Sequence, residues 1–488
     1  MAPRRSQLRL SIGAASTGLW SSWNGKRPLV VTRLLLLAAA ALLGLSAAGT
    51  IELTFTLQPS YALLGLAALC GLPWVVDGWL RLPRSVQAAA GALIVVYLVA
   101  TLFGSPARLA SQSRSGTLRP LVYLVDLGLG LATIGLLCGV WSSTFARRLL
   151  VVFCAGATLT ALLAVYQWFA LHFGLALSDI NSAPNSDGFT TGHRFQGVGL
   201  LGWERTRGTF KEPLVLGIFC IIALPLGILA FRTSSGRLRV AAGGCCVAVV
   251  AALVLTVSAL SVGIFAATAG VVALVVALRD GHVRVSAALG VSVVLGLVVG
   301  PALLSNPSAL SSLTGRSSDD LKLTADNRKS AWRAAVRHWQ ERPVLGYGPG
   351  QSSVRLAYRP DPRAVNRTVA PIVLGSAQGI WAASLIDAGV VGFCAWIALF
   401  GSLLALGVRA AWRDRGPRLL LILWAASAAV LASQLTGDRV DFRVWVALGA
   451  LTAASQLSGG ERAHRQREPE QPADERRSNG VGVELARR

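Results

Sequence analysis

Long runs of apolar residues, separated by short polar connections, extend over most of the chain. Several runs approach the ~20 residues that an α-helix needs to cross a bilayer. The short alternating segments typical of a transmembrane β-barrel are not seen. The pattern therefore predicts an all-α fold, a polytopic transmembrane helical bundle of about twelve spans. We expect these spans at residues 29–48, 60–79, 86–103, 119–140, 149–172, 213–231, 239–257, 262–278, 284–303, 378–407, 418–435 and 442–457.

Composition and charge agree with a membrane protein. The 488 residues are 53% hydrophobic and 14% charged, a balance at which a soluble domain would aggregate. The net charge of +23 would suggest nucleic acid in a soluble protein. Here the basic residues lie between apolar runs, so we interpret them as a topology signal and expect no nucleic-acid partner. All seven cysteines lie inside apolar runs, which argues against a disulfide framework or a cysteine-based metal site.

The positive-inside rule gives one consistent topology. With the N-terminus in the cytoplasm, alternate connections are short and basic, and two long connections, about 173–212 and 304–370, fall on the outer face. We expect a multi-pass protein of the cytoplasmic (inner) membrane with both termini in the cytoplasm. Its predicted parts are an N-terminal tail over 1–28, retained rather than cleaved as a signal peptide, a transmembrane domain over 29–457, and a disordered tail over 458–488.

The second outer loop carries eleven basic and five acidic residues, on the side where the positive-inside rule asks for no positive charge. One explanation is an anionic ligand such as a phosphate or diphosphate, which arginine forks bind well. The other is contact with anionic lipid headgroups. Neither outer loop has an acidic pair typical of a bound metal, apart from Asp319-Asp320, and no cofactor is expected.

Within this loop, residues 326–341 predict an amphipathic helix with Asp326 as its N-cap. An apolar stripe with two tryptophans lies opposite a charged face, which is typical of a helix at the membrane interface. The stripe is Trp332, Ala335, Val336 and Trp339, and the charged face carries Arg333, Arg337 and Glu341.

The stretch "RPVLGYGPG" follows this helix. Proline ends a helix because it lacks an N–H donor, and glycines adopt backbone angles closed to other residues. We predict a tight structural turn, the elbow, that reverses the chain over the outer mouth of the bundle. A phosphate-cradling loop is the alternative, although the stretch lacks the lysine of such loops. The turn residues are Pro343, Gly346, Gly348 and Gly350.

Three stretches together resemble the O-antigen ligase and polymerase family of bacterial membrane glycosyltransferases. The first is Arg328, Trp332 and the elbow sequence. The second is "RTRGTFKEPLVLG" at 205–217, and the third, weaker one is "SLIDAGVVGF", which contains Asp387. With the pattern of spans, the resemblance covers about 30–457.

This resemblance implies transfer of a glycan from an undecaprenyl-diphosphate carrier to an acceptor hydroxyl on a glycan or lipid, by a polymerase or a ligase. It also implies a metal-independent, inverting reaction at the outer face, with arginines holding the diphosphate and a histidine as base. Arginine forks can absorb charge on the leaving diphosphate. The expected catalytic residues are Arg207, His193 and Asp387, and the expected substrate-binding residues are Arg205, Arg328, Arg333, Arg337 and Gln378.

The chain departs from the family pattern where members commonly have a His-Asn pair, because Gln378-Gly379 stands there. His193, His338, Asp126 or Asp387 could supply the base instead, with His338 expected as a surface residue. Two other functions remain open. One is a transporter or flippase of saccharides, although no repeat is visible. The other is an inactive relative that serves as a scaffold in envelope assembly.

Overall fold

A computed structural model describes residues 26–45, 51–52, 56–57, 59–104, 113–176, 206–210, 213–256, 259–282, 318–358, 379–414, 416–433 and 441–465. Within these ranges the protein is helical, apart from two strands of two residues each that pair antiparallel. The elements are α2 (Lys26–Leu42), η1 (Leu43–Leu45), β1 (Ile51–Glu52), β2 (Thr56–Leu57), α3 (Pro59–Cys70), α4 (Leu72–Arg81), α5 (Arg84–Phe103), α6 (Ser113–Val140), α7 (Ser143–Phe173), α8 (Pro213–Thr233), α9 (Gly236–Thr256), α10 (Ala259–Arg279), α13 (Ser318–Glu341), α14 (Gln351–Tyr358), α16 (Ile380–Arg413), α17 (Pro417–Ser433) and α18 (Phe442–Arg465).

The predicted multi-pass helical fold is confirmed. Among the described residues, six helices are long and apolar enough to cross a membrane, in α5, α6, α7, α8, α9 and α16. Shorter apolar helices at Pro28–Leu42, Gly263–Arg279 and Pro417–Ser433 coincide with three more predicted spans. The count of twelve stays a prediction, and the span expected at 284–303 lies outside the described residues.

The span predicted at 60–79 is broken. The structure divides it into α3 and α4, which meet at an angle of 82°. Gly71 separates the two helices, and Pro73 lies in the first turn of α4. Proline is favoured in a first turn, where its missing N–H has no helical partner to lose, so the sequence restarts a helix here. A bent pair of this kind is either one broken span or a re-entrant loop.

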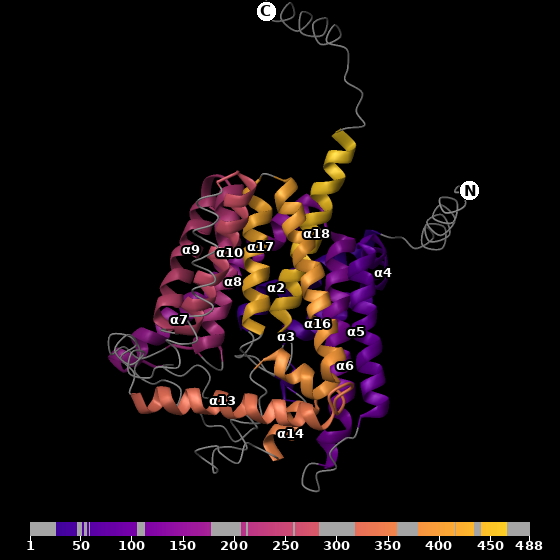
Figure 1. Cartoon of the computed structure of the whole chain (residues 1–488). Helices are drawn as coiled ribbons and strands as arrows, with labels where there is room; N and C mark the ends of the chain where they lie inside the picture. Colours follow the sequence, from indigo (N-terminus) through magenta and orange to yellow (C-terminus); the bar gives the residue numbers. More distant parts are fainter. Residues whose placement is uncertain are drawn as a thin grey trace, which may run out of the picture.

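The apolar helices stand side by side in one bundle (Figure 1). Helices α7 to α10 form one side, α4 to α6 form the other, and α2, α3, α16, α17 and α18 lie between them. Small residues let backbones approach: Gly78 of α4 packs directly against the backbone of Gly135 of α6. Such close contacts between glycines are typical of helix packing in membranes.

Helix α13 lies across one end of the bundle, opposite to the end from which α18 projects (Figure 1). The amphipathic helix predicted in the second outer loop is therefore present, with one correction. It begins at Ser318, so Asp326 lies inside it and is not its N-cap. Its buried face is made by Ala334, Ala335 and His338, whereas the predicted stripe residues Trp332 and Val336 are exposed.

Candidate functional site

The elbow after α13 is bound to a break in helix α16. At Gly389 the backbone leaves the helical conformation, with φ 64° and ψ −161°. A break of this kind leaves backbone donors and acceptors without partners inside the helix. The elbow supplies the missing hydrogen-bond partners. Gly348 N donates to the carbonyl of Asp387 at 2.8 Å, and Val390 N donates to the carbonyl of Pro343 at 2.8 Å. Two further bonds join Tyr347 N to Ile386 O and Val391 N to Val344 O.

The side chain of Asp387 strengthens the same joint. Its carboxylate accepts hydrogen bonds from Gly350 N at 2.9 Å and Ser352 N at 2.6 Å, at the start of α14. Asp387 is fully buried. A carboxylate that accepts backbone N–H bonds at a helix N-terminus is held firmly and complements the helix dipole. This arrangement favours a positioning role for Asp387, and its predicted catalytic role remains a prediction.

The elbow needs glycine at its close approach to α16. Gly346, Gly348 and Gly350 all have positive φ, at 65°, 105° and 73°. A Cβ on Gly346 would lie 2.5 Å from the carbonyl oxygen of Ile386. The backbone of the elbow therefore touches the backbone of α16 with no room for a side chain between them.

A group of polar side chains lies beside the elbow. His338 is fully buried, contrary to the expected surface position, and its Nδ1 lies 3.9 Å from the carboxylate of Glu341. The Tyr347 hydroxyl donates to the same carboxylate. Arg355 stacks over the Tyr347 ring, with its Cζ 4.0 Å from the ring centroid. Burial, and then the Glu341 hydrogen bond, raises the pKa of the Tyr347 phenol.

Arg207 lies in a buried turn inside the bundle. Only 3% of the residue is exposed. The turn is fixed by Gln167 of α7, whose Oε1 accepts from Arg207 N at 3.0 Å and from Gly208 N at 2.8 Å. Thr209 Oγ1 donates to the carbonyl of Gly44 at 2.6 Å, which ties the turn to the end of α2 and η1. Helix α7 and the short helix η1 therefore hold the Arg207 backbone in a defined position.

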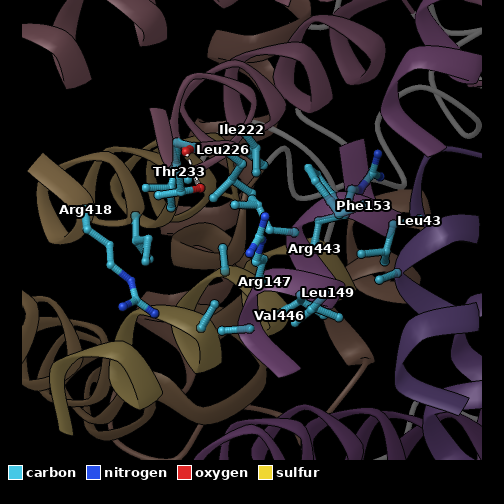
Figure 2. Close-up of a pocket in the computed structure, with 18 of the residues that line it drawn as sticks. Leu43, Arg147, Leu149, Phe153, Ile222, Leu226, Thr233, Arg418, Arg443 and Val446 are labelled. Carbon is cyan, nitrogen blue, oxygen red and sulfur yellow. Dashed lines mark hydrogen bonds between the residues drawn. The ribbon is translucent and has the colours of Figure 1, made fainter. Parts of the chain in front are cut away.

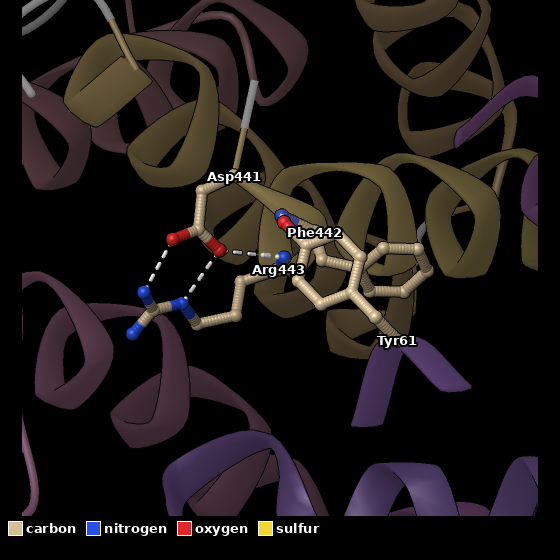
Figure 3. A network of polar contacts seen from close by, with 4 residues as sticks. All are labelled: Tyr61, Asp441, Phe442 and Arg443. Atoms are coloured by element: carbon tan, nitrogen blue, oxygen red, sulfur yellow. Dashed lines mark hydrogen bonds and ion pairs between the residues drawn. The ribbon is translucent and has the colours of Figure 1, made fainter. Parts of the chain in front are cut away.

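A second buried arginine, Arg443, lies next to this turn. Figure 3 shows its guanidinium facing the Asp441 carboxylate. The Arg443 Cζ lies 4.9 Å from the ring centroid of Phe210, three residues after Arg207. Asp441 binds the guanidinium through both carboxylate oxygens, with Nε at 2.7 Å from Oδ1. The Tyr61 hydroxyl accepts from Phe442 N at 3.2 Å. The Arg443 Nη1 group is buried and has no hydrogen-bond partner among the described residues.

Arg443 also sets the charge state of Asp441. Burial alone would raise the pKa of this carboxyl, but the adjacent guanidinium outweighs burial and holds the pKa below its usual value. The pair is therefore ionised at neutral pH. We call the group formed by Arg207, Phe210, Asp441 and Arg443 the arginine cluster.

Two acidic side chains lie within electrostatic reach of three tyrosines, the half-buried Tyr61 and the buried Tyr97 and Tyr123. Asp126 of α6 lies within electrostatic reach of Tyr61 and Tyr123, and Asp387 within that of Tyr97 and Tyr123. The Tyr97 and Tyr123 rings stack with their centroids 5.7 Å apart. Asp126 is partly exposed, whereas Asp387 is fully buried in the elbow.

The other predicted site residues do not gather in one described place. His193, Arg205 and Gln378 lie outside the described residues. Arg328 is part of α13, but its side chain is not described. Arg333 is exposed on α13 and Arg337 is half-buried. Within the described part of the chain, no three His, Cys, Asp or Glu side chains are placed to hold a metal ion.

The sequence interpretation missed Asp441 and Arg443. The signal was present, because Arg443 falls inside the span predicted at 442–457. An ionisable residue within a transmembrane helix is expensive and is a functional candidate by default. The bidentate pair with Asp441 explains how the helix can carry this charge.

Comparison with protein families gives one match. The model of the O-antigen ligase family matches residues 244–397. This region includes most of α9, all of α10, α13 and α14, the elbow, and α16 through its break at Gly389. The arginine cluster lies outside it on both sides. No curated protein matches the chain.

Proposed function

We propose, on the premise that residues 244–397 match the model of the O-antigen ligase family, that the protein transfers a glycan from a polyprenyl-diphosphate carrier to an acceptor hydroxyl at the outer face of the cytoplasmic membrane. The observation that carries the proposal is the arginine cluster, in which Arg443 lies over the Phe210 ring and the buried Arg207 stands three residues before that ring in the same turn. Burying guanidinium groups among apolar helices is costly, and an anionic substrate accounts for that cost.

In this proposal Arg207 and Arg443 bind the diphosphate. Asp441 holds two nitrogens of Arg443, so the guanidinium is oriented before the substrate arrives. The acceptor hydroxyl attacks the anomeric carbon while the bond to the diphosphate oxygen breaks, which inverts the anomeric centre. Negative charge grows on the departing diphosphate, and the fixed arginines stabilise it in place of a metal ion.

The acceptor proton needs a base, and we propose Asp126. It is partly exposed and within electrostatic reach of Tyr61, which borders the arginine cluster. Asp387 accepts two backbone hydrogen bonds inside the elbow, so we assign it to positioning α13 and α14. The exposed face of α13, with Arg333, then lies where a carrier headgroup would approach from the bilayer.

The test is Arg207→Gln in cells that lack the native gene. Removing one fixed donor from a developing oxyanion typically lowers turnover by about 10²–10³-fold. We expect short carrier-linked glycan to accumulate while the amount of protein in the membrane stays unchanged. The matched control is Arg237→Gln, an exposed arginine in α9 that should complement fully. Full complementation by Arg207→Gln would show that Arg207 does not bind the diphosphate.

A further inference from the structure

An elongated cavity of about 250 Å³ runs between α2, α7, α8, α17 and α18 (Figure 2). Its walls are mostly apolar, formed by side chains such as Leu43, Phe153, Ile222, Leu226 and Val446. Lining residues on α8 extend from Phe219 to Thr233. At 1.5 Å per residue this separation is about 21 Å along the helix. The cavity is therefore long and narrow, with the shape of a hydrocarbon chain.

The two ends of the cavity differ in charge. One end is formed where α7 and α17 begin and α8 ends, and there Arg147 and Arg418 line it. Arg147 is exposed and Arg418 half-buried, and among the described residues neither forms an ion pair. Arg443 closes the opposite end, where Asp441 already balances its charge. Uncompensated positive charge is thus confined to the Arg147 end.

We infer that this cavity binds one acyl chain of an anionic glycerophospholipid, whose phosphate lies between Arg147 and Arg418. The end with these arginines is the one predicted to face the cytoplasm, where anionic headgroups attract basic residues. The proposed lipid site is therefore at the other end of the bundle from α13 and Arg207, and it does not depend on the proposed glycan transfer.

The dimensions favour a phospholipid over a polyprenyl carrier. Each leaflet provides about half of the ~30 Å hydrocarbon core, so a phospholipid chain extends roughly 15 Å from its headgroup. The cavity length of about 21 Å accommodates that depth and ends at Arg443. A much longer prenyl chain would have to leave the cavity. The N-termini of α7 and α17 at the same end add favourable dipoles for a phosphate.

The experiment measures lipid binding to the full-length protein in detergent by native mass spectrometry. The probes are phosphatidylglycerol, phosphatidylcholine with the same acyl chains, and undecaprenyl phosphate. The test variant is R147Q/R418Q. Its matched control is R148Q/R409Q, which removes the same charge from two exposed arginines outside the cavity. A third variant, Ala450→Phe, places a large side chain in the cavity wall without changing charge.

We expect one tightly bound phosphatidylglycerol and weaker phosphatidylcholine. Each arginine near a headgroup contributes about 1 kcal/mol, so R147Q/R418Q should bind roughly 25-fold more weakly. Ala450→Phe should lose the bound lipid, and R148Q/R409Q should retain it. Equal binding of the two phospholipids, or full retention by R147Q/R418Q, would overturn the inference. Tighter binding of undecaprenyl phosphate than of phosphatidylglycerol would also overturn it, in favour of a carrier site.

Discussion

The hydrogen bonds between Asp387 and the elbow predict how much stability the protein loses when Asp387 is replaced. Replacing it with alanine would leave Gly350 N and Ser352 N without their acceptor inside a buried turn. Each unsatisfied buried donor costs about 1–3 kcal/mol, so Asp387→Ala should lower the free energy of unfolding by roughly 2–6 kcal/mol. Asp387→Asn keeps one acceptor oxygen but points an amide at the other donor, so we expect about half that loss.

The assay combines stability and turnover in purified protein. Unfolding by a denaturing detergent, followed by tryptophan fluorescence, gives the change in unfolding free energy, and glycan transfer is expressed per folded molecule. Asp414→Ala is the control. This half-exposed residue lies at the end of α16, and the one hydrogen bond described for its side chain is accepted from Gly416 N. We expect Asp387→Asn to lose stability and transfer together. Normal stability with abolished transfer would refute the positioning role and identify Asp387 as the base.

Two further predictions concern the same framework. Gly389→Ala should lower the free energy of unfolding by about 1–3 kcal/mol or more, because the φ/ψ of this residue is nearly restricted to glycine and a Cβ would overlap the Val344 carbonyl. The control is Gly401→Ala, in open space on the same helix, which should be neutral or slightly stabilising in the same unfolding assay. Arg443→Gln should abolish glycan transfer and also lower the free energy of unfolding. Breaking a fully buried ion pair costs ~3–5 kcal/mol, and we expect a smaller loss here because the Asp441 side chain is 37% exposed. The double variant D441N/R443Q should regain stability but not transfer, and recovery of transfer would remove Arg443 from the site.

Much of the fold could be predicted from hydropathy, and the exceptions have physical causes. Helices α5, α8 and α16 begin within two residues of the predicted spans. The break between α3 and α4 was missed because one glycine and one proline hardly change the mean hydropathy of a long apolar window. The start of α13 was predicted too late in the chain, because Asp326 is a plausible N-cap when only the local sequence is considered.

The candidate site was only half accessible from the sequence. Arg207 and Asp387 could be proposed from local motifs, because turn residues and an acid inside an apolar run are visible in one stretch. Their partners could not, since the Phe210–Arg443 contact and the bonds from Asp387 to the elbow join segments far apart in the chain. His338 was expected at the surface because its neighbours in sequence are charged, yet helix α13 turns it inward.

The structure explains why an apolar chain keeps a polar elbow. A helix broken at Gly389 would expose unpaired N–H and C=O groups at the edge of the bundle, where each costs several kcal/mol if water is absent. The elbow satisfies these groups with its own backbone, and the Asp387 carboxylate satisfies the start of α14 in return. The break and the elbow are therefore complementary, and neither would be stable alone. Because α13 enters this joint directly, the break in α16 fixes the direction of α13 and the position of Arg333 and Arg337 on it.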